Sequence, residues 1–433
     1  MESAPKIENN HKIFKLMVEI QNSGFIKKFN EEDYLYWDKL KYKNDKYNTN
    51  ELWSAIKLSR LFNFKTVRFG NYEFNYLPTN YVQKSLHLFD LYIGGYLGAK
   101  NIIPEHEKAH YLVNSIMEES ITSSQMEGAN TTRKKAKEML QKELKPINKS
   151  EQMIYNNFQT IKYIVQHKNE DLTPENLLYI HRLISNKTLD NKNEEGNFRL
   201  NNDIFVVNST NGETVHIPPD FKEIPQLIND LCIFFNEENK DFIHPISKGI
   251  IIHFMIGFIH PFSDGNGRTA RALFYWFLLK KGYWLTEYLS ISNIIKNTKN
   301  QYEKAFLYTE NDDNDLTYFI TYNLKVMQKA YESLRKYIER KQNAVIKTAH
   351  YLKIPNINER QAELIKILNE ENERVFTINE IKNKFGISDF TARIDLNGLV
   401  NLGFLESINV NKIKKNYLKS TNFNELLVQF NVK

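Results

Sequence analysis

The stretch from His253 to Arg271, HFMIGFIHPFSDGNGRTAR, decides the fold of the surrounding region. An apolar run from Gly249 to Ile259 is typical of a buried helix. It ends at His260, because a proline disfavours helical geometry in the residue before it. A second apolar run, Ala270 to Leu279, begins after a short polar loop at residues 263–267. The stretch therefore predicts a helix–loop–helix whose loop leads into the N-terminus of a buried helix.

The loop has the composition of an anion-binding site. Gly265 and Gly267 allow positive φ on either side of Asn266, and leave backbone N–H groups facing a concavity. The first turn of the next helix adds unpaired N–H donors at the positive end of its dipole. Arg268 and Arg271 are three residues apart, so both lie on one face of the helix near this end. Two guanidinium groups beside such a loop favour a polyphosphate over a single phosphate.

Two further residues of the stretch carry chemistry. Asp264 offers hard oxygen ligands that can hold Mg²⁺ against phosphate oxygens. His260 can accept a proton near neutral pH. The stretch thus predicts a phosphate-transfer site in which the loop binds a nucleotide, a metal clamps it and His260 deprotonates an incoming hydroxyl. A capped helix with two solvated arginines is the structural alternative, but it does not explain why all these residue types occur together.

Residues His260 to Arg271 resemble the signature of the Fic family, His-Pro-Phe-x-Asp/Glu-Gly-Asn-Gly-Arg-x-x-Arg, at every fixed position. The resemblance implies a mainly α fold, a Fic-type helical bundle with a β-hairpin flap, and transfer of AMP from ATP to a Ser, Thr or Tyr hydroxyl of a protein. It also implies roles for individual residues, with His260 as the catalytic base, Asp264 as the Mg²⁺ ligand, Gly265, Asn266 and Gly267 around the α- and β-phosphates, and Arg268 and Arg271 on the β- and γ-phosphates.

A second motif precedes this core. Gly128 suits the position just after a helix, which puts Glu127 at an exposed helix end. The segment Ser123-x-x-x-Glu127-Gly128 is similar to the Fic inhibitory-helix motif, Ser/Thr-x-x-x-Glu-Gly/Asn, of proteins that carry the inhibitor N-terminal to the core. That resemblance implies that Glu127 pairs with Arg271 and turns the phosphates of a bound nucleotide away from in-line geometry.

Residues 196–219 are a non-helical stretch with hairpin signals. Asp203 to Val207 has strand composition, Asn211-Gly212 is a strong turn signal, and Thr214 to Ile217 is the returning strand. A surface decoration is one interpretation. In the Fic family a hairpin in this place, the flap, holds the target protein by main-chain pairing, and the resemblance implies that residues 196–219 do the same.

Composition limits the alternatives. The chain has 433 residues and a formal net charge of +6, which is small for this length and indicates compositional bias before a nucleic-acid surface. Its single cysteine, Cys232, lies in an apolar run and is predicted to be a core residue, in a chain that suits a reducing compartment. There is no signal-peptide pattern and no apolar run of membrane-spanning length, so we expect a cytoplasmic protein without a membrane partner.

We predict three parts: an aromatic-rich N-terminal subdomain at 1–78, a Fic core with the inhibitory helix at 79–345, and a winged helix-turn-helix domain at 355–433. Helices are predicted at 81–97, 105–119, 132–144, 150–167, 173–184, 220–238, 290–308 and 315–341. Further helices at 359–369, 376–386 and 388–399 precede a Lys-rich hairpin, an order that resembles a winged helix-turn-helix.

The partner of the C-terminal domain stays open between two interpretations. Its third helix carries only Arg393, whereas Lys412, Lys414 and Lys415 lie in the wing, where they can reach phosphates. Residues 355–420 therefore either bind DNA or form a protein-docking or homo-oligomer contact.

The resemblance and the residues together predict a protein adenylyltransferase autoinhibited by Glu127. Two alternatives are a winged-helix DNA-binding regulator whose Fic core senses nucleotide, and a Fic-type enzyme that removes AMP or uses another phosphate donor. The complete set of catalytic residue types favours the adenylyltransferase.

Overall fold

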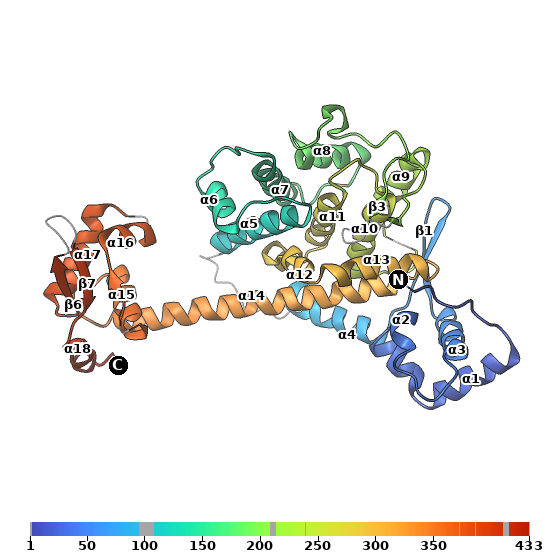
Figure 1. Cartoon of the computed structure of the whole chain (residues 1–433), viewed down its shortest axis with the longest axis horizontal. Coiled ribbons are helices and arrows are strands. Elements are labelled where there is room, and N and C mark those ends of the chain that lie inside the picture. Colours follow the sequence, from blue (N-terminus) through green and yellow to red (C-terminus); the bar gives the residue numbers. More distant parts are fainter. Residues whose placement is uncertain are drawn as a thin grey trace. The chain divides into compact units, whose positions relative to one another are not determined.

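The computed structural model describes residues 2–94, 108–207, 214–238, 240–371, 373–385, 387–409 and 415–432. Within these residues the protein is mainly helical, with small antiparallel sheets, which confirms the predicted fold class (Figure 1). The chain divides into two compact units, Met1–Leu334 and Arg335–Lys433. Helix α14 (Thr317–Tyr351) includes the boundary between them.

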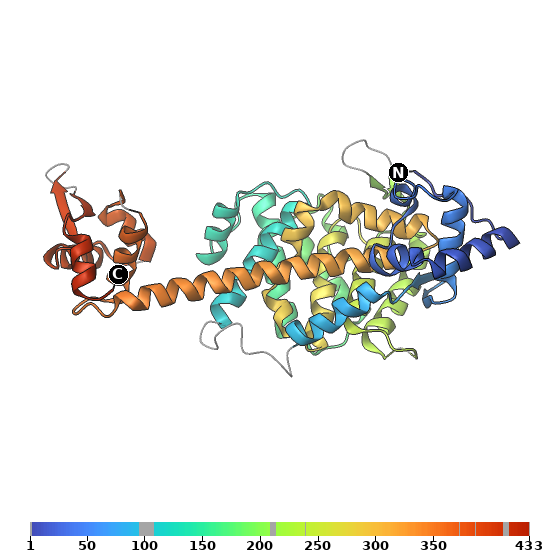
Figure 2. The same ribbon diagram turned by 90° about the horizontal axis from the view of Figure 1, so that it is seen from below.

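Helices α10 (Pro245–Ile259) and α11 (Asn266–Lys280) are the predicted helix–loop–helix, and they pack against each other inside the first unit (Figure 1, Figure 2). Almost every side chain of α10 is buried, as expected for a helix that is apolar on all sides. A Cβ on Gly257 would lie 2.8 Å from the Phe306 ring. Glycine at this position therefore lets the neighbouring helix approach the backbone of α10 closely.

Helices α7 (Lys149–Gln166), α8 (Pro174–Ser185) and α9 (Ile224–Asn236) pack against this pair. The same unit also contains α4 (Asn80–Phe89), α5 (Lys108–Met126), α6 (Arg133–Gln141), α12 (Ile291–Asn297) and α13 (Lys299–Asn311). Thr173 caps α8 in a reciprocal capping box with Asn176, and a proline occupies the first turn. Cys232 is buried in α9, which confirms its prediction as a core residue.

Two of the predicted helices in this unit differ clearly from the structure, and a third is described only in part. The helix predicted at 290–308 is two helices, because Thr298 leaves helical geometry at φ −127° and ψ 31°. The helix predicted at 105–119 continues to Met126 and therefore includes most of the inhibitory motif. The predicted end of the helix at 81–97 lies outside the described residues. Its described part is α4 followed by a π-helical turn, Asp90–Gly94.

The N-terminal residues form an aromatic cluster that also contains side chains from α13 and α14. It is built on α1 (His11–Asn22), α2 (Trp37–Leu40) and α3 (Thr49–Leu61), and includes Tyr308 and Tyr318. Arg60 is buried within it and donates hydrogen bonds to Asn30 and Tyr318. The hairpin β1 (Lys65–Phe69) and β2 (Tyr72–Tyr76) follows and was not predicted, because the density of aromatic residues hid its alternating pattern.

The predicted flap is a short antiparallel pair of strands, β3 (Val206–Val207) and β4 (Thr214–His216), with Val206 opposite His216. It is shorter than predicted, and its turn, residues 208–213, lies outside the described residues. Arg199 ties the start of the segment to the catalytic stretch. Its backbone N–H donates to Pro261 O at 2.9 Å and its Nε donates to His260 O at 2.9 Å.

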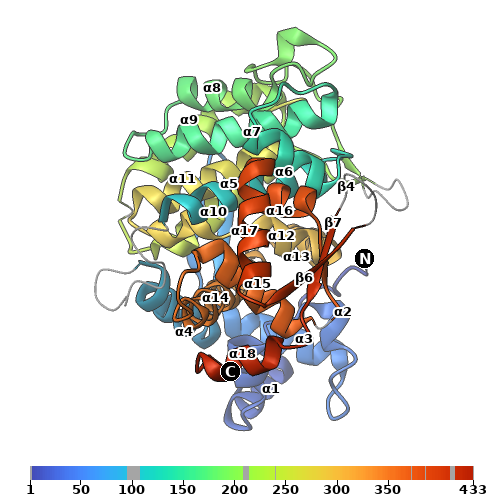
Figure 3. The same ribbon diagram turned by 90° about the vertical axis from the view of Figure 1, so that its left-hand side faces the viewer.

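The second unit has the predicted succession of helices and hairpin (Figure 3). Helices α15 (Glu359–Glu370), α16 (Ile378–Phe385) and α17 (Asp389–Asn401) pack on a three-stranded sheet of order β5-β7-β6, formed by Val375–Phe376, Lys415–Lys419 and Leu405–Asn409, before a last helix, α18 (Phe423–Gln429). Lys412 and Lys414, predicted in the wing, lie outside the described residues. No helix in the described part of either unit has the length and apolarity needed to cross a membrane.

Candidate active site

His260 ends α10 in an unusual conformation. Its φ of +47° places it in the left-handed region, which is rare for a residue other than glycine and concentrates at functional sites. Its Nδ1 lies 3.3 Å from the carbonyl oxygen of Gly257. Because a carbonyl can only accept, Nδ1 carries the hydrogen and Nε2 keeps a lone pair. Burial lowers the pKa of His260 to about 4, so the ring is neutral at pH 7.

The loop after His260 is closed by the Asn266 side chain. Its Oδ1 accepts from Phe262 N at 3.0 Å and its Nδ2 donates to Phe262 O at 2.8 Å. Gly265 has φ +85°, as predicted, but its N–H donates to Asp264 Oδ1 and is not free. Gly267 does not have the positive φ that was expected, because α11 already begins at Asn266. The first intrahelical bond of α11 runs from Thr269 N to Gly265 O, so the first-turn amides that precede it are those of Asn266, Gly267 and Arg268.

His181, which sequence reasoning did not single out, supports this loop from α8. Its ring stacks on Phe262 with 3.7 Å between the ring centroids, and its Nε2 donates to Asp264 O at 2.9 Å. Gly196 N donates to its Nδ1 at 3.1 Å, which fixes the tautomer. Burial lowers the pKa of His181 to about 4. In the sequence it is only one histidine on an apolar helix face, a pattern without a functional signal.

Two fully buried histidines make the stability of the first unit depend on pH. Burial lowers the pKa of His181 to about 4 and that of His253 to about 3, below the value of an unfolded chain near 6.5. Between these values the unfolded state binds more protons, so the free energy of unfolding falls as pH decreases below about 6.5 and is unaffected by these groups above it. Urea denaturation at pH 7.5 and 5.0 should show this loss. His181→Gln should reduce the difference, and an unchanged difference would contradict the assignment.

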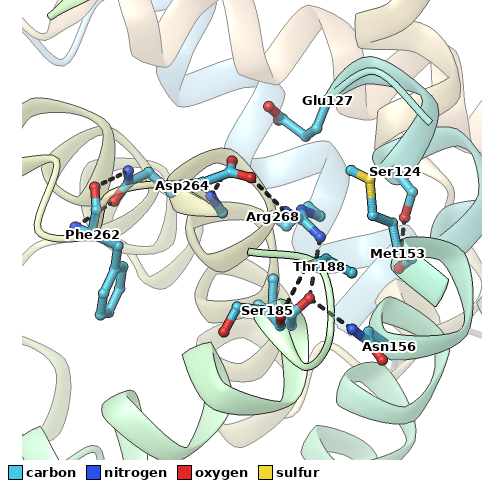
Figure 4. Close-up of polar contacts among 12 residues, drawn as sticks. Ser124, Glu127, Met153, Asn156, Ser185, Thr188, Phe262, Asp264 and Arg268 are labelled. Atoms are coloured by element: carbon cyan, nitrogen blue, oxygen red, sulfur yellow. Dashed lines mark hydrogen bonds and ion pairs between the residues drawn. The ribbon is translucent and has the colours of Figure 1, made fainter. Parts of the chain in front are cut away.

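Arg268 presents unused hydrogen-bond donors inside the site. Its side chain is fully buried, and Nη1 donates to Ile184 O at 3.2 Å (Figure 4). Nη2 lies 3.6 Å from Asp264 Oδ2, beyond hydrogen-bond distance. Among the described residues neither Nε nor Nη2 has a hydrogen-bond partner. Buried donors without acceptors are costly, so this guanidinium is arranged to receive an anion.

Arg271 is held by the predicted inhibitory segment. Its side chain is almost fully buried, and Nη2 donates to Glu127 Oε1 at 2.8 Å, so the predicted ion pair is present. Ser123 accepts two further hydrogen bonds from Arg271. Nε of Arg271 donates to Ser123 Oγ at 2.8 Å, and Nη2 donates to the Ser123 carbonyl oxygen at 3.2 Å. Burial opposes ionisation of Glu127, but the charge of Arg271 prevails and lowers the pKa of the carboxyl group.

Glu127 also lies over the start of α11. Gly128 adopts φ +95° and ends α5, as predicted, so that Glu127 extends toward Asp264 and Arg268 (Figure 4). A Cβ on Gly267 would lie only 2.2 Å from Glu127 Oε1. The carboxylate therefore occupies space directly above a first-turn residue, where an anion bound at the helix N-terminus would lie. Glycine at 267 is needed for this close approach and not for a special backbone conformation.

Asp264 can serve as the single protein ligand of a metal ion that arrives with a nucleotide. Its carboxylate is 52% exposed, with one oxygen already accepting from Gly265 N. The described residues contain no group of three or more His, Cys, Asp or Glu side chains placed to hold a metal ion. Mg²⁺ commonly uses one or two carboxylates, several waters and substrate phosphates, and does not need a complete protein cage. The donor set is therefore compatible with Mg²⁺ in the presence of phosphates.

Two segments of the chain match known families. Residues 171–278, which include α8, α10 and most of α11, match the Fic/DOC family. Residues 360–408 match the DeoR-like helix-turn-helix domain. The chain therefore contains a Fic domain followed by a DeoR-like helix-turn-helix domain, which confirms the two domain types predicted from the sequence.

Curated relatives share the Fic region. "Protein adenylyltransferase Fic" from Aedes aegypti is 32% identical over 126 residues, 28% of this chain and 23% of that protein. The protein of the same name from Nematostella vectensis is 28% identical over 128 residues, 29% of this chain and 28% of that protein. The chain thus spans about a quarter of the length of these relatives. A solved Fic family protein from Desulfovibrio desulfuricans G20 aligns with a TM-score of 0.49 at 20% identity, covering 79% of this chain and 97% of that one.

Proposed function

We propose that the first unit is a protein adenylyltransferase, which transfers AMP from ATP to a Ser, Thr or Tyr hydroxyl of a target protein or of itself. The observation that carries the proposal is the single loop where a neutral His260, the first-turn amides of α11 and the unused donors of Arg268 meet. The name of the similar proteins from Aedes aegypti and Nematostella vectensis supports it.

In the proposed reaction, each bond that forms or breaks and the proton that moves can be assigned to ATP, the target hydroxyl or a residue of this chain. The hydroxyl oxygen of the target attacks the α-phosphorus, the bond from that phosphorus to the bridging oxygen breaks, and pyrophosphate leaves. His260 takes the hydroxyl proton on Nε2, the nitrogen whose lone pair is free. The amides of Asn266 and Gly267 and the guanidinium of Arg268 stabilise the charge on the phosphates, and Arg271 binds the γ-phosphate once Glu127 has moved.

Asp264 is proposed to hold Mg²⁺, which, when bound, neutralises charge on the phosphate oxygens of ATP. Its exposed carboxylate lies beside the Arg268 guanidinium, so a metal there would be next to the arginine that contacts the phosphates. The same exposure leaves room for the waters that Mg²⁺ retains.

Glu127 is proposed to keep the site in an inhibited state. Its carboxylate binds the same Arg271 nitrogen that a γ-phosphate would engage, and it crowds the start of α11 at Gly267. A nucleotide that enters the site must either displace this carboxylate or bind with its phosphates away from the position that allows in-line attack. Both outcomes lower the rate of in-line attack.

The target protein is proposed to bind along residues 196–219. The two strands of the flap leave an edge to which an extended segment can add by main-chain hydrogen bonds. Such pairing fixes the position of the target segment but selects only weakly for its sequence.

We also propose that the reaction takes place in the cytoplasm, because a chain with one cysteine suits a reducing environment.

For the three predicted parts, we propose that residues 1–78 stiffen the core at 79–345 and that residues 355–433 recruit a partner.

The match of the C-terminal domain to a DeoR-like helix-turn-helix suggests that this partner is DNA. However, α17 exposes Phe390 at 73% and Ile394 at 53%, apolar side chains one turn apart on the helix that would read bases. These exposed residues favour a protein-docking or oligomer contact over DNA. Gel-shift assays at several salt concentrations distinguish the two, because phosphate contacts make DNA affinity fall steeply with salt.

Intact-mass spectrometry of the protein incubated with ATP and Mg²⁺ tests the proposed activity. Transfer of AMP adds about 329 Da and transfer of phosphate about 80 Da, as the transferred groups dictate. We expect the larger adduct, increased in the Glu127→Gly variant. Absence of any adduct on the protein or on proteins of a cell extract would contradict the proposal, and removal of AMP from a labelled protein would indicate the reverse activity.

A further inference from the structure

The flap is joined to the helix of the catalytic histidine by one side chain, that of His216 at the end of β4. Its Nε2 lies 2.8 Å from the carbonyl oxygen of Phe258, in the last turn of α10. Its Nδ1 lies 2.9 Å from Glu310 Oε2, at the end of α13. The side chains of His216 and Glu310 are only 9% and 18% exposed, so the contacts are shielded from solvent.

Both partners of this ring are acceptors. A carbonyl oxygen and an ionised carboxylate have no hydrogen to donate, so both ring nitrogens must carry hydrogen to make these two bonds. A proton on Glu310 would satisfy the same count, with a neutral ring. The ion pair is favoured because Nδ1 lies 2.9 Å from Glu310 Oε2, within the range of a charge-assisted hydrogen bond.

From these contacts, and resting on the proposed transfer reaction, we propose that His216 is a positioning residue. As an imidazolium held between Phe258 and Glu310, it fixes the returning strand of the flap at a set distance from His260. His216 pairs with Val206 across the flap, so a fixed His216 also fixes the pairing edge offered to a target. Phe258 lies two residues before His260, which ends the same helix. Helix α10 therefore positions both the pairing edge of the flap and the catalytic base His260.

Other groups around the ring are consistent with this state. A cleft of about 640 Å³ opens beside it and is lined by Tyr72 of β2, Asp220 after the flap, and Glu310. Asp220 carries a second negative charge, because hydrogen bonds from Lys222 N and Asn202 lower the pKa of its carboxyl group. The charge of His216 also adds to burial in lowering the pKa of His260. A charged His216 thus also helps to keep the base unprotonated.

The test compares His216→Gln and Glu310→Gln in the full-length chain carrying Glu127→Gly, with His244→Gln as the matched control. His244 also lies next to α10 and contacts a carboxylate, Asp90 Oδ2, at 3.0 Å, but it is at the opposite end of the helix. We expect each of the first two variants to reduce self-labelling with ATP by about tenfold or more, with the Kd for ATP by calorimetry unchanged. The double variant should be no worse than either single one, because the two residues act as one unit.

Two readouts do not depend on catalysis. Nitrogen NMR of the histidine rings at pH 7 should show both nitrogens of His216 protonated, and Glu310→Gln should abolish that signature. Hydrogen exchange at residues 214–217 should accelerate in His216→Gln. A neutral His216 ring, or unchanged exchange and labelling in a folded His216→Gln variant, would overturn the proposal. If no variant transfers AMP, the proposed function fails, while the NMR and exchange results still decide whether His216 anchors the flap.

Discussion

Replacing Glu127 with glycine is expected to raise self-labelling with radiolabelled ATP by at least about tenfold, which corresponds to about 1.4 kcal/mol of population shift. The reason is geometric and electrostatic. The substitution removes the carboxylate that binds Arg271 Nη2 at 2.8 Å and that lies over Gly267. Arg271 is then free for a γ-phosphate, and the N-terminus of α11 is open.

Two further variants separate charge from backbone effects. Glu127→Gln keeps the size of the side chain but removes its charge, so it should raise labelling less than glycine does. Glu118→Gln is the matched control, because Glu118 lies on the same helix and pairs with Arg133 at its exposed side. It should leave labelling unchanged. A folded Glu127→Gly variant that labels no faster than the parent would contradict the inhibitory role.

The second large effect is expected from His260→Ala. Loss of the base should lower AMP transfer by about 10²- to 10⁴-fold, the usual contribution of general base catalysis. Binding of ATP by calorimetry should be nearly unchanged, because the phosphate contacts are assigned to the loop and to Arg268 and not to the imidazole. His87→Ala, on an exposed position of α4, is the control. Transfer that survives His260→Ala would show that another group accepts the proton.

The pH dependence of transfer follows from the same residue. Because burial lowers the pKa of His260 to about 4, the ring is unprotonated and competent throughout the neutral range. The single-turnover rate of the Glu127→Gly variant should therefore stay flat from pH 8 to about 6, without the loss near 6.5 that an ordinary histidine base would give. A midpoint near 6.5 would mean that the base is solvated during the reaction.

The sequence was sufficient where local chemistry determines structure. Proline at 261 and glycine at 265 define the break between α10 and α11, and Thr173 with the proline after it marks the start of α8. The contact between Glu127 and Arg271 was predictable as well, although only through resemblance to a family motif. Neither residue predicts the other by spacing, since they are 144 positions apart.

The rest of the site depends on long-range contacts that no local pattern encodes. His181 reaches Asp264 across 83 positions, Arg199 reaches His260 across 61, and His216 reaches Glu310 across 94. Each is an isolated polar residue in its own segment. Its importance appears only when the fold brings the partners together. The role of Gly267 could not be predicted from the sequence either, because the space it leaves is filled by Glu127, which follows α5.

The central claim is that the loop after α10 presents the α-phosphate of ATP to a hydroxyl while His260 removes the proton. Incubation of the Glu127→Gly variant with ATP labelled on either the α- or the γ-phosphate tests it most directly. The account predicts protein-bound label from α-labelled ATP alone, and none from either form in Glu127→Gly combined with His260→Ala. Label transferred from the γ-phosphate, or α-label that persists without His260, would contradict it.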